Sequence, residues 1–71
     1  MDYYIIPATL ARKLALTDFR TGNEEHGYVV NTSDLEVFGI EAAKQMGARY
    51  VSAWEAQKFI DQVTNNKDRR L

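Results

Sequence analysis

The chain has 71 residues, a formal net charge of −1 and no cysteine. A chain of this length forms one small domain that buries only about 60% of the surface exposed when it is unfolded, so it has little material to spare for a deep substrate cleft. The missing cysteines exclude disulfides, thiolate zinc sites and thiol nucleophiles, and no run approaches the roughly 18 consecutive apolar residues of a membrane span.

The N-terminal segment predicts a strand followed by a short helix. Residues 2–6, DYYII, are rich in aromatic and β-branched side chains, which favour a strand. Pro7 suits the first position of a helix, which we expect to end near Leu14 or Ala15. Asp2 stands where a signal peptide would carry basic residues, so we expect mature structure and a cytoplasmic location.

The next segment predicts a hairpin. The stretch GYVVN at 27–31 has strand composition, and LTDFR at 16–20 is a candidate partner strand across the loop TGNEEH. Gly22 and Gly27 lie where such a loop needs conformational freedom. We therefore expect a strand at 27–31 and an additional hairpin strand before it.

The middle of the chain predicts a helix over residues 34–46. SDLE at 33–36 matches a capping box, in which the serine and glutamate side chains bond the backbone amides at the helix start, and Gly47 suits the helix end. The helical stripe is not consistent along this length, since two apolar residues point away from it. The alternatives are a kink at Gly39, or an extended run through LEVF with a shorter helix that begins only at Ile40. The stripe consists of Leu35, Phe38, Ala42 and Met46, and the opposite residues are Val37 and Ile40.

The C-terminal third predicts a strand, a helix and a tail. ARYVS at 48–52 has strand composition, and SAWE at 52–55 is a second capping box that starts a helix over 53–63. Trp54 lies about 160° from the apolar stripe of this helix, beside Lys58. We expect a charged, disordered tail over 65–71. The apolar stripe consists of Ala56, Phe59, Ile60 and Val63.

These elements predict an α+β fold in the order β-α-β-α-β-α. We expect a small single-domain sandwich over residues 1–64, with about three helices packed on one face of a three- or four-stranded sheet.

The sequence offers little for catalysis. His26 is the only histidine, and it lies in NEEHG at an expected loop tip, where it could titrate or contribute to a metal site. One histidine without cysteine is a poor ligand set, and no nucleophile elbow, P-loop or zinc-protease motif occurs. We interpret His26 as a solvated turn residue, and we expect no enzymatic activity, no cofactor and no metal.

Nucleic-acid binding is the alternative function. TLARKLALTD, residues 9–18, resembles the first helix and turn of a helix-turn-helix, but glycines and glutamates follow where a basic recognition helix would lie. Arg12, Lys13 and Arg20 could form a small basic patch for phosphates. Residues 21–41 contain five acidic residues and no Lys or Arg, which disfavours phosphate binding.

Protein binding is the leading hypothesis. Trp54, Val37 and Ile40 lie off the core stripes of their helices, with Lys58 beside Trp54, and exposed aromatic residues often anchor interfaces. Trp54 is either a lid over the strand and loop that precede its helix or the anchor of an interface. We expect an unidentified protein partner or a homodimer, with no membrane contact, and we expect nucleic acid to be the weaker alternative.

Overall fold

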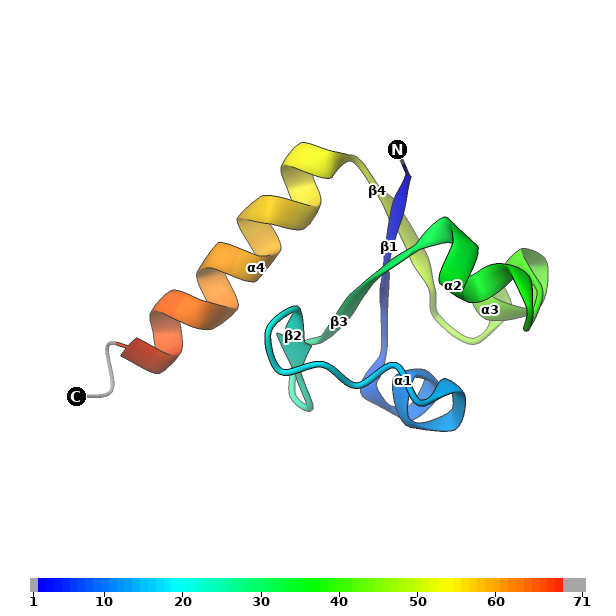
Figure 1. Cartoon of the computed structure of the whole chain (residues 1–71), viewed down its shortest axis with the longest axis horizontal. Helices are drawn as coiled ribbons and strands as arrows, with labels where there is room; N and C mark the ends of the chain where they lie inside the picture. The colour runs from blue at the N-terminus through cyan, green and yellow to red at the C-terminus, as the bar shows by residue number, and fades with distance from the viewer. Residues whose placement is uncertain (1, 69–71) are drawn as a thin grey trace.

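A computed structural model describes residues 2–68 of the chain, with side chains through residue 63. Within these residues, four strands and four helices follow one another (Figure 1). The strands are β1 (Tyr3–Ile6), β2 (Gly22–Asn23), β3 (Gly27–Asn31) and β4 (Arg49–Val51), and the helices are α1 (Ala8–Leu14), α2 (Thr32–Glu36), α3 (Ile40–Gln45) and α4 (Ala53–Asp68). The α+β class and the order of the elements agree with the prediction.

The four strands form one antiparallel sheet in the order β2-β3-β1-β4. The central strand β1 pairs with β3, where Ile5 lies opposite Val29, and with β4, where Tyr4 lies opposite Tyr50. The outer strand β2 is short and pairs only with the beginning of β3.

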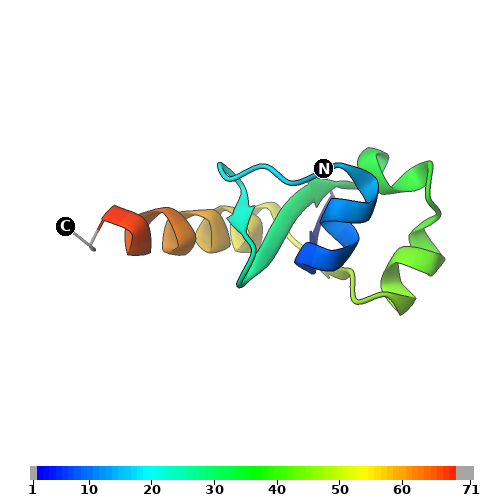
Figure 2. The ribbon, with the colours of Figure 1, turned by 90° about the horizontal axis from the view of Figure 1, so that it is seen from below.

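The sheet has an apolar cluster on each face, because successive side chains of a strand point to opposite sides. One cluster joins Tyr4 and Ile6 of β1 to α1, α2 and α3, whereas the other joins Ile5 to α4. Figures 1 and 2 show the strands between α4 on one side and the three shorter helices on the other. The sequence predicted all helices on one face, and the placement of α4 differs from that prediction.

Helix α1 ends in a left-handed residue that is not glycine. Pro7 is the N-cap rather than the first helical residue, with φ −68° and ψ 156°. The helix ends at Leu14 as predicted, and Ala15 adopts φ 58° and ψ 39°. This conformation turns the chain so that the Leu16 amide donates to the carbonyl of Ala11 at 2.8 Å, which closes the helix end.

The additional hairpin strand exists, but it lies within the expected loop. Gly22 and Asn23 form β2, whereas residues 16–20 form no strand. Gly22 is required because a Cβ there would lie 2.0 Å from the carbonyl oxygen of Gly27. The chain before β2 is held by a local turn, in which the Thr21 amide donates to the carbonyl of Asp18 at 2.8 Å.

The predicted continuous helix over 34–46 is wrong, and the alternative break at Gly39 is confirmed. The other alternative, an extended run through LEVF, is wrong as well, because Leu35 and Glu36 belong to α2. Gly39 has φ 111°, a conformation that interrupts the helix and that L-residues rarely adopt. Because α3 starts anew after the break, its side chains no longer continue the helical positions of α2. Ile40 therefore packs against the core, whereas Val37 is exposed to solvent. The N-terminus also differs, because α2 begins after Asn31, whose amide donates to the Asp34 carboxylate at 3.1 Å.

Helix α4 confirms the second capping box and its apolar stripe. Ala56 and Val63 are buried, and Phe59 and Ile60 are half-buried against the sheet. The helix continues past 63, where its end was expected, to Asp68. It therefore overlaps the predicted tail over 65–71, of which residues 69–71 lie outside the described residues. Within the described part of the chain, no helix is both long and apolar enough to span a bilayer.

Candidate functional site

Trp54 is exposed at the first turn of α4. The Glu55 amide donates to Ser52 Oγ at 3.1 Å, and the Ser52 amide donates to the Glu55 carboxylate at 3.1 Å. This box fixes Trp54 as the second residue of the helix, on the side away from Ala56. The indole is 70% exposed, and Lys58 Nζ lies 5.1 Å from its ring centroid, within cation–π distance.

Trp54 borders a shallow groove between α4 and the β4 edge of the sheet. The groove has a volume of about 210 Å³. Its apolar part comes from Ile5, Val51 and Phe59. The remaining lining residues are Trp54, Arg49, Glu55, Lys58 and Gln62. We call these eight residues the Trp54 groove. It offers an aromatic ring, an apolar surface and two cations to a ligand, and its one carboxylate, that of Glu55, accepts from the Ser52 amide.

The two cations of the Trp54 groove have no carboxylate partner in the described part of the chain. Arg49 and Lys58 form no ion pair with another described residue, and the nearby Glu55 carboxylate accepts from the Ser52 amide. Arg49 is not among the residues predicted from the sequence. Its signal was strand alternation, since Arg49 shares the face of Val51, and α4 follows β4 after one residue.

The other predicted interface residues do not belong to this groove. Ile40 packs against the cluster of Tyr4 and Ile6, so the helix break accounts for its apolar side chain. Val37 is 97% exposed and lies between α2 and α3. The structure therefore brings Trp54 and Lys58 together and leaves Val37 as a separate exposed position.

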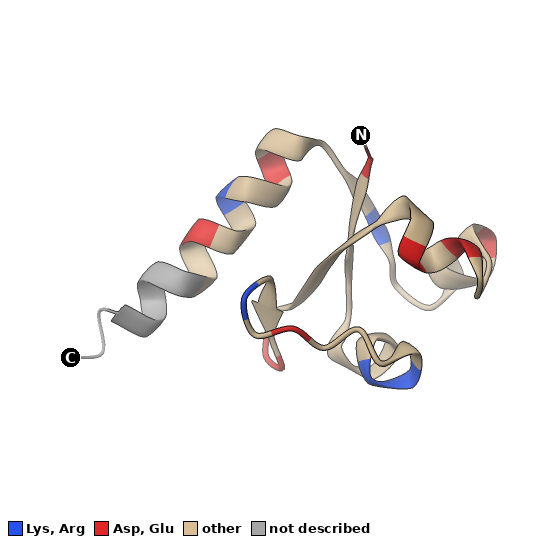
Figure 3. Cartoon of the chain, viewed as in Figure 1, with Lys and Arg blue, Asp and Glu red and all other residues tan. Residues whose placement is uncertain are grey.

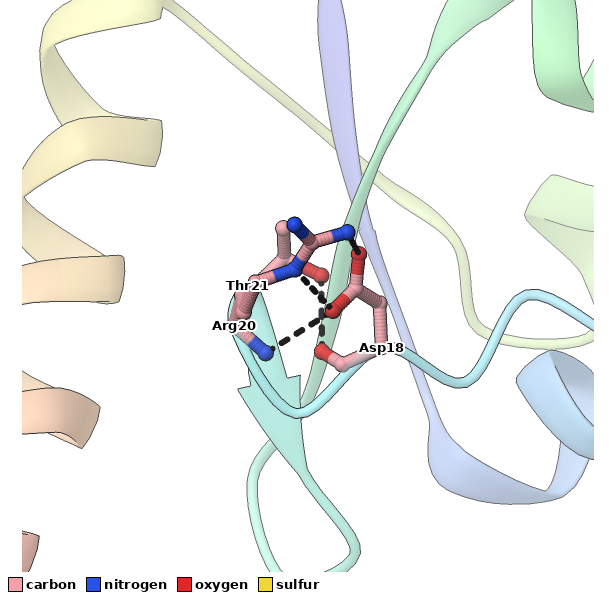
Figure 4. Close-up of polar contacts among 3 residues, drawn as sticks. All are labelled: Asp18, Arg20 and Thr21. Carbon is pink, nitrogen blue, oxygen red and sulfur yellow. Dashed lines mark hydrogen bonds and ion pairs between the residues drawn. The ribbon is translucent and has the colours of Figure 1, made fainter.

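The predicted basic patch is largely neutralised by carboxylates. Arg12 forms an ion pair with Glu24. Arg20 donates from Nε and Nη2 to the two carboxylate oxygens of Asp18 at 3.1 and 3.2 Å, and its amide donates to the same carboxylate at 2.9 Å (Figure 4). These bonds, the side-chain bond first, lower the pKa of Asp18. Of the three cations, Lys13 alone forms no ion pair with a described residue.

A larger cavity of about 760 Å³ lies on the other side of α4, between Ile60 and the segment 15–21. Its volume is in the range of small-molecule sites, which also need polar groups directed at the ligand. The charged groups here are already engaged, because Asp18 and Arg20 bond each other and Asp34 accepts from the Asn31 amide. The smaller Trp54 groove is therefore the better candidate.

Glu24 and His26 have structural partners in the hairpin turn. Tyr28 is buried, and its hydroxyl donates to the Glu24 carboxylate at 3.1 Å. Burial, and then this bond, raise the pKa of Tyr28. The His26 amide donates to Asn23 Oδ1 at 2.7 Å, as in a polar turn. Among the described residues, no three His, Asp or Glu side chains group as metal ligands would.

Comparisons with known proteins add no assignment. No family model matches the chain, and neither the curated proteins nor the solved structures contain a significant match.

Proposed function

We propose that the chain is a small protein-interaction module that binds a segment of a partner protein in the Trp54 groove. The observation that supports this proposal is the 70% exposure of Trp54 beside unpaired cations and an apolar surface. The groove favours a partner segment with an apolar anchor for Trp54 and carboxylates for Arg49 and Lys58. Cation–π contact and charge complementarity would act together in such a complex.

The free energy available from burying the exposed surface of Trp54 is large for so small a protein. An aromatic side chain buries roughly 150–250 Å², so 70% exposure leaves on the order of 100–170 Å² to bury. At about 25 cal/mol per Å², covering all of the exposed part of Trp54 sets an upper limit of about 3–4 kcal/mol on its contribution to binding, before the entropy cost of association is subtracted. Because this area is not buried on folding, removing the ring should cost the free energy of unfolding less than about 1 kcal/mol.

The test is selection of peptides from a random displayed library against the immobilised chain. Selected peptides should contain an apolar residue next to Asp or Glu, and should bind the Trp54→Ala variant at least about tenfold more weakly. The matched control is Phe19→Ala, since Phe19 is 74% exposed but lies outside the groove. Peptides that bind Trp54→Ala as well as the natural chain would contradict the proposal. The melting temperatures of both variants show whether the fold is retained.

Nucleic-acid binding through Arg12, Lys13 and Arg20 stays a prediction, and the ion pairs of the two arginines weaken it. Titration with duplex and single-stranded DNA tests it. If all three cations neutralise phosphates, the logarithm of the binding constant should fall with the logarithm of salt concentration with a slope of about −3. Absence of binding at low salt would refute this alternative.

A further inference from the structure

Val37 is an exposed apolar side chain between α2 and α3, with acidic residues on both sides of it in the sequence. It is the most exposed of the large hydrophobic side chains described, at 97%. Glu36 precedes it on α2 and Glu41 follows on α3, and both are exposed. Figure 3 shows acidic residues over these two helices. We call Val37, Glu36 and Glu41 the Val37 corner.

The backbone holds the Val37 corner in a defined shape. The Gly39 amide donates to the Leu35 carbonyl at 2.8 Å, and the Ala43 amide donates to the Gly39 carbonyl at 2.9 Å. These bonds close α2 and open α3 around the residue with φ 111°. Val37 is thus presented on a hydrogen-bonded turn, which lowers the entropy lost when it docks.

The Trp54 groove has the complementary character. It is a partly apolar groove, whereas the corner presents an exposed valine. The groove carries Arg49 and Lys58 against one carboxylate, that of Glu55, and the corner carries Glu36 and Glu41, of which Glu41 forms an ion pair with Lys44 at 3.8 Å. Figure 3 shows a basic residue on β4, and both basic and acidic residues on α4. A groove facing a second groove would bring cations together, and a corner facing a corner would bring carboxylates together. Only the contact between groove and corner joins opposite charges.

We propose that the chain associates with itself head to tail, with the Val37 corner of one copy in the Trp54 groove of the next. This inference rests on the proposed function, because it uses the groove as a protein-binding site and names a second copy as its occupant. Within one copy the two surfaces cannot meet, since the corner belongs to the helices on one face of the sheet and the groove lies beside α4 on the other. A contact between different surfaces leaves one of each free, so the product is a ring or an open chain of copies.

The contact should be weak and sensitive to salt. A single valine in a groove of about 210 Å³ buries much less than the roughly 1,000 Å² of a stable interface. Association should therefore appear only at high protein concentration. Raising salt from about 0.1 M to about 1 M shortens the Debye length from about 10 Å to about 3 Å, which should reduce association further.

Sedimentation equilibrium with two single variants tests the inference. The natural chain should show an average mass that rises with concentration, whereas Trp54→Ala and Val37→Lys should each remain monomeric, the latter because a lysine on the corner repels Arg49 and Lys58 of the groove. Both residues are exposed, so the variants should fold, and their circular dichroism verifies it. In an equimolar mixture, each variant keeps the surface that the other has lost, so the mixture should form a dimer and nothing larger.

Several outcomes would overturn the inference. A natural chain that stays monomeric at all concentrations would refute self-association, and a mixture that stays monomeric would refute the pairing of groove with corner. If selected peptides still require Trp54 in either case, the proposed function survives and only the second copy as occupant is wrong. If the peptides do not require Trp54 either, both proposals fail.

Cross-linking gives an independent readout, because the chain has no cysteine of its own. Val37→Cys is mixed with Gln62→Cys, whose exposed position lines the groove without contributing charge. A short bismaleimide should join the two variants more efficiently than it joins either variant to itself. Thr9→Cys is exposed on α1 and replaces Val37→Cys as the control. Equal yields with Thr9→Cys and Val37→Cys would overturn the inference.

Discussion

Gly27 is the position where a single methyl group should damage this fold most clearly. It has φ 97°, and an added Cβ would lie 2.4 Å from the carbonyl oxygen of Ile6, at the pairing of β1 with β3. The backbone conformation should cost Gly27→Ala about 1–3 kcal/mol, and the displaced carbonyl about 1–3 kcal/mol more. Alanine also reduces the conformational entropy of the unfolded chain, which stabilises the folded state by about 0.5–1 kcal/mol and offsets part of this loss. The net loss of about 1–5 kcal/mol is a substantial part of the roughly 4–10 kcal/mol expected for 71 residues.

Gly39→Ala is the matched control, because Gly39 has a similar φ of 111° but open space around it. The nearest atom to an added Cβ there is Ala42 Cβ, at an ordinary contact distance of 3.8 Å. Its loss should therefore be the backbone contribution alone, about 1–2 kcal/mol. Urea denaturation followed by circular dichroism gives the free energies of unfolding of both variants. Equal losses would show that the approach to Ile6 has no energetic weight and would refute the reasoning.

The remaining predictions concern one helix end and two titrating groups. Ala15→Gly should raise the melting temperature by a few degrees, because the left-handed conformation at φ 58° costs alanine about 1–2 kcal/mol and glycine much less; an unchanged or lower temperature would contradict this. Hydrogen bonds from Arg20 lower the pKa of Asp18, so its contribution is present above the ordinary carboxyl pKa near 3.9 and is lost as pH falls through the lowered pKa. Urea midpoints of Asp18→Asn should therefore depend less on pH in acid than those of the natural chain, and parallel curves would contradict it. The hydrogen bond from Tyr50 to Asp2, at 3.0 Å, raises the pKa of Tyr50, so its contribution is present below about pH 10 and is lost as pH rises through the raised pKa; Tyr50→Phe should flatten that alkaline decline, and an unchanged decline would contradict it.

The elements that the sequence predicted well are those fixed by neighbours in the chain. The start of α4 depends on Ser52 and Glu55, three residues apart, and both reciprocal bonds form as expected. The strand at Gly27–Asn31 depends on local composition and has the predicted bounds. In both cases the determining interactions are local or follow from the side-chain types, so no knowledge of the tertiary structure is needed.

The start of α2 shows where local signals compete. The stretch NTSDLE contains two overlapping boxes, Asn31 with Asp34 and Ser33 with Glu36. The sheet selects the first, because Asn31 pairs with Tyr3 at the end of β3 and the next amide, that of Thr32, donates to the carbonyl of Asp2. The helix then has to begin at once. This choice depends on pairing between residues nearly 30 positions apart, which composition does not reveal.

The fourth strand shows the same limit. Residues 16–20 have strand-like composition, but the Asp18 carboxylate bonds the Arg20 side chain and amide and so closes a turn. The residue that pairs with β3 is instead Gly22, whose missing Cβ allows close approach to Gly27. From composition Gly22 is expected in a loop, yet it forms part of strand β2. Its role could be recognised only when the partner backbone was in place.

The candidate site follows from the size of the chain rather than from any motif. Four strands about 4.8 Å apart are wider than one helix of about 10 Å diameter, so α4 cannot cover its face of the sheet. The two cavities lie where α4 leaves this face of the sheet uncovered: the Trp54 groove beside Arg49 at the β4 margin, and the larger cavity beside Val29 of β3. The helical wheel places Trp54 off the apolar stripe, and strand alternation places Arg49 on the face of Val51, but the sequence does not show that α4 packs on this face and brings Trp54 and Arg49 to one groove. A convex apolar element laid along α4 would cover the β4 margin, and this is the role that we propose for the partner.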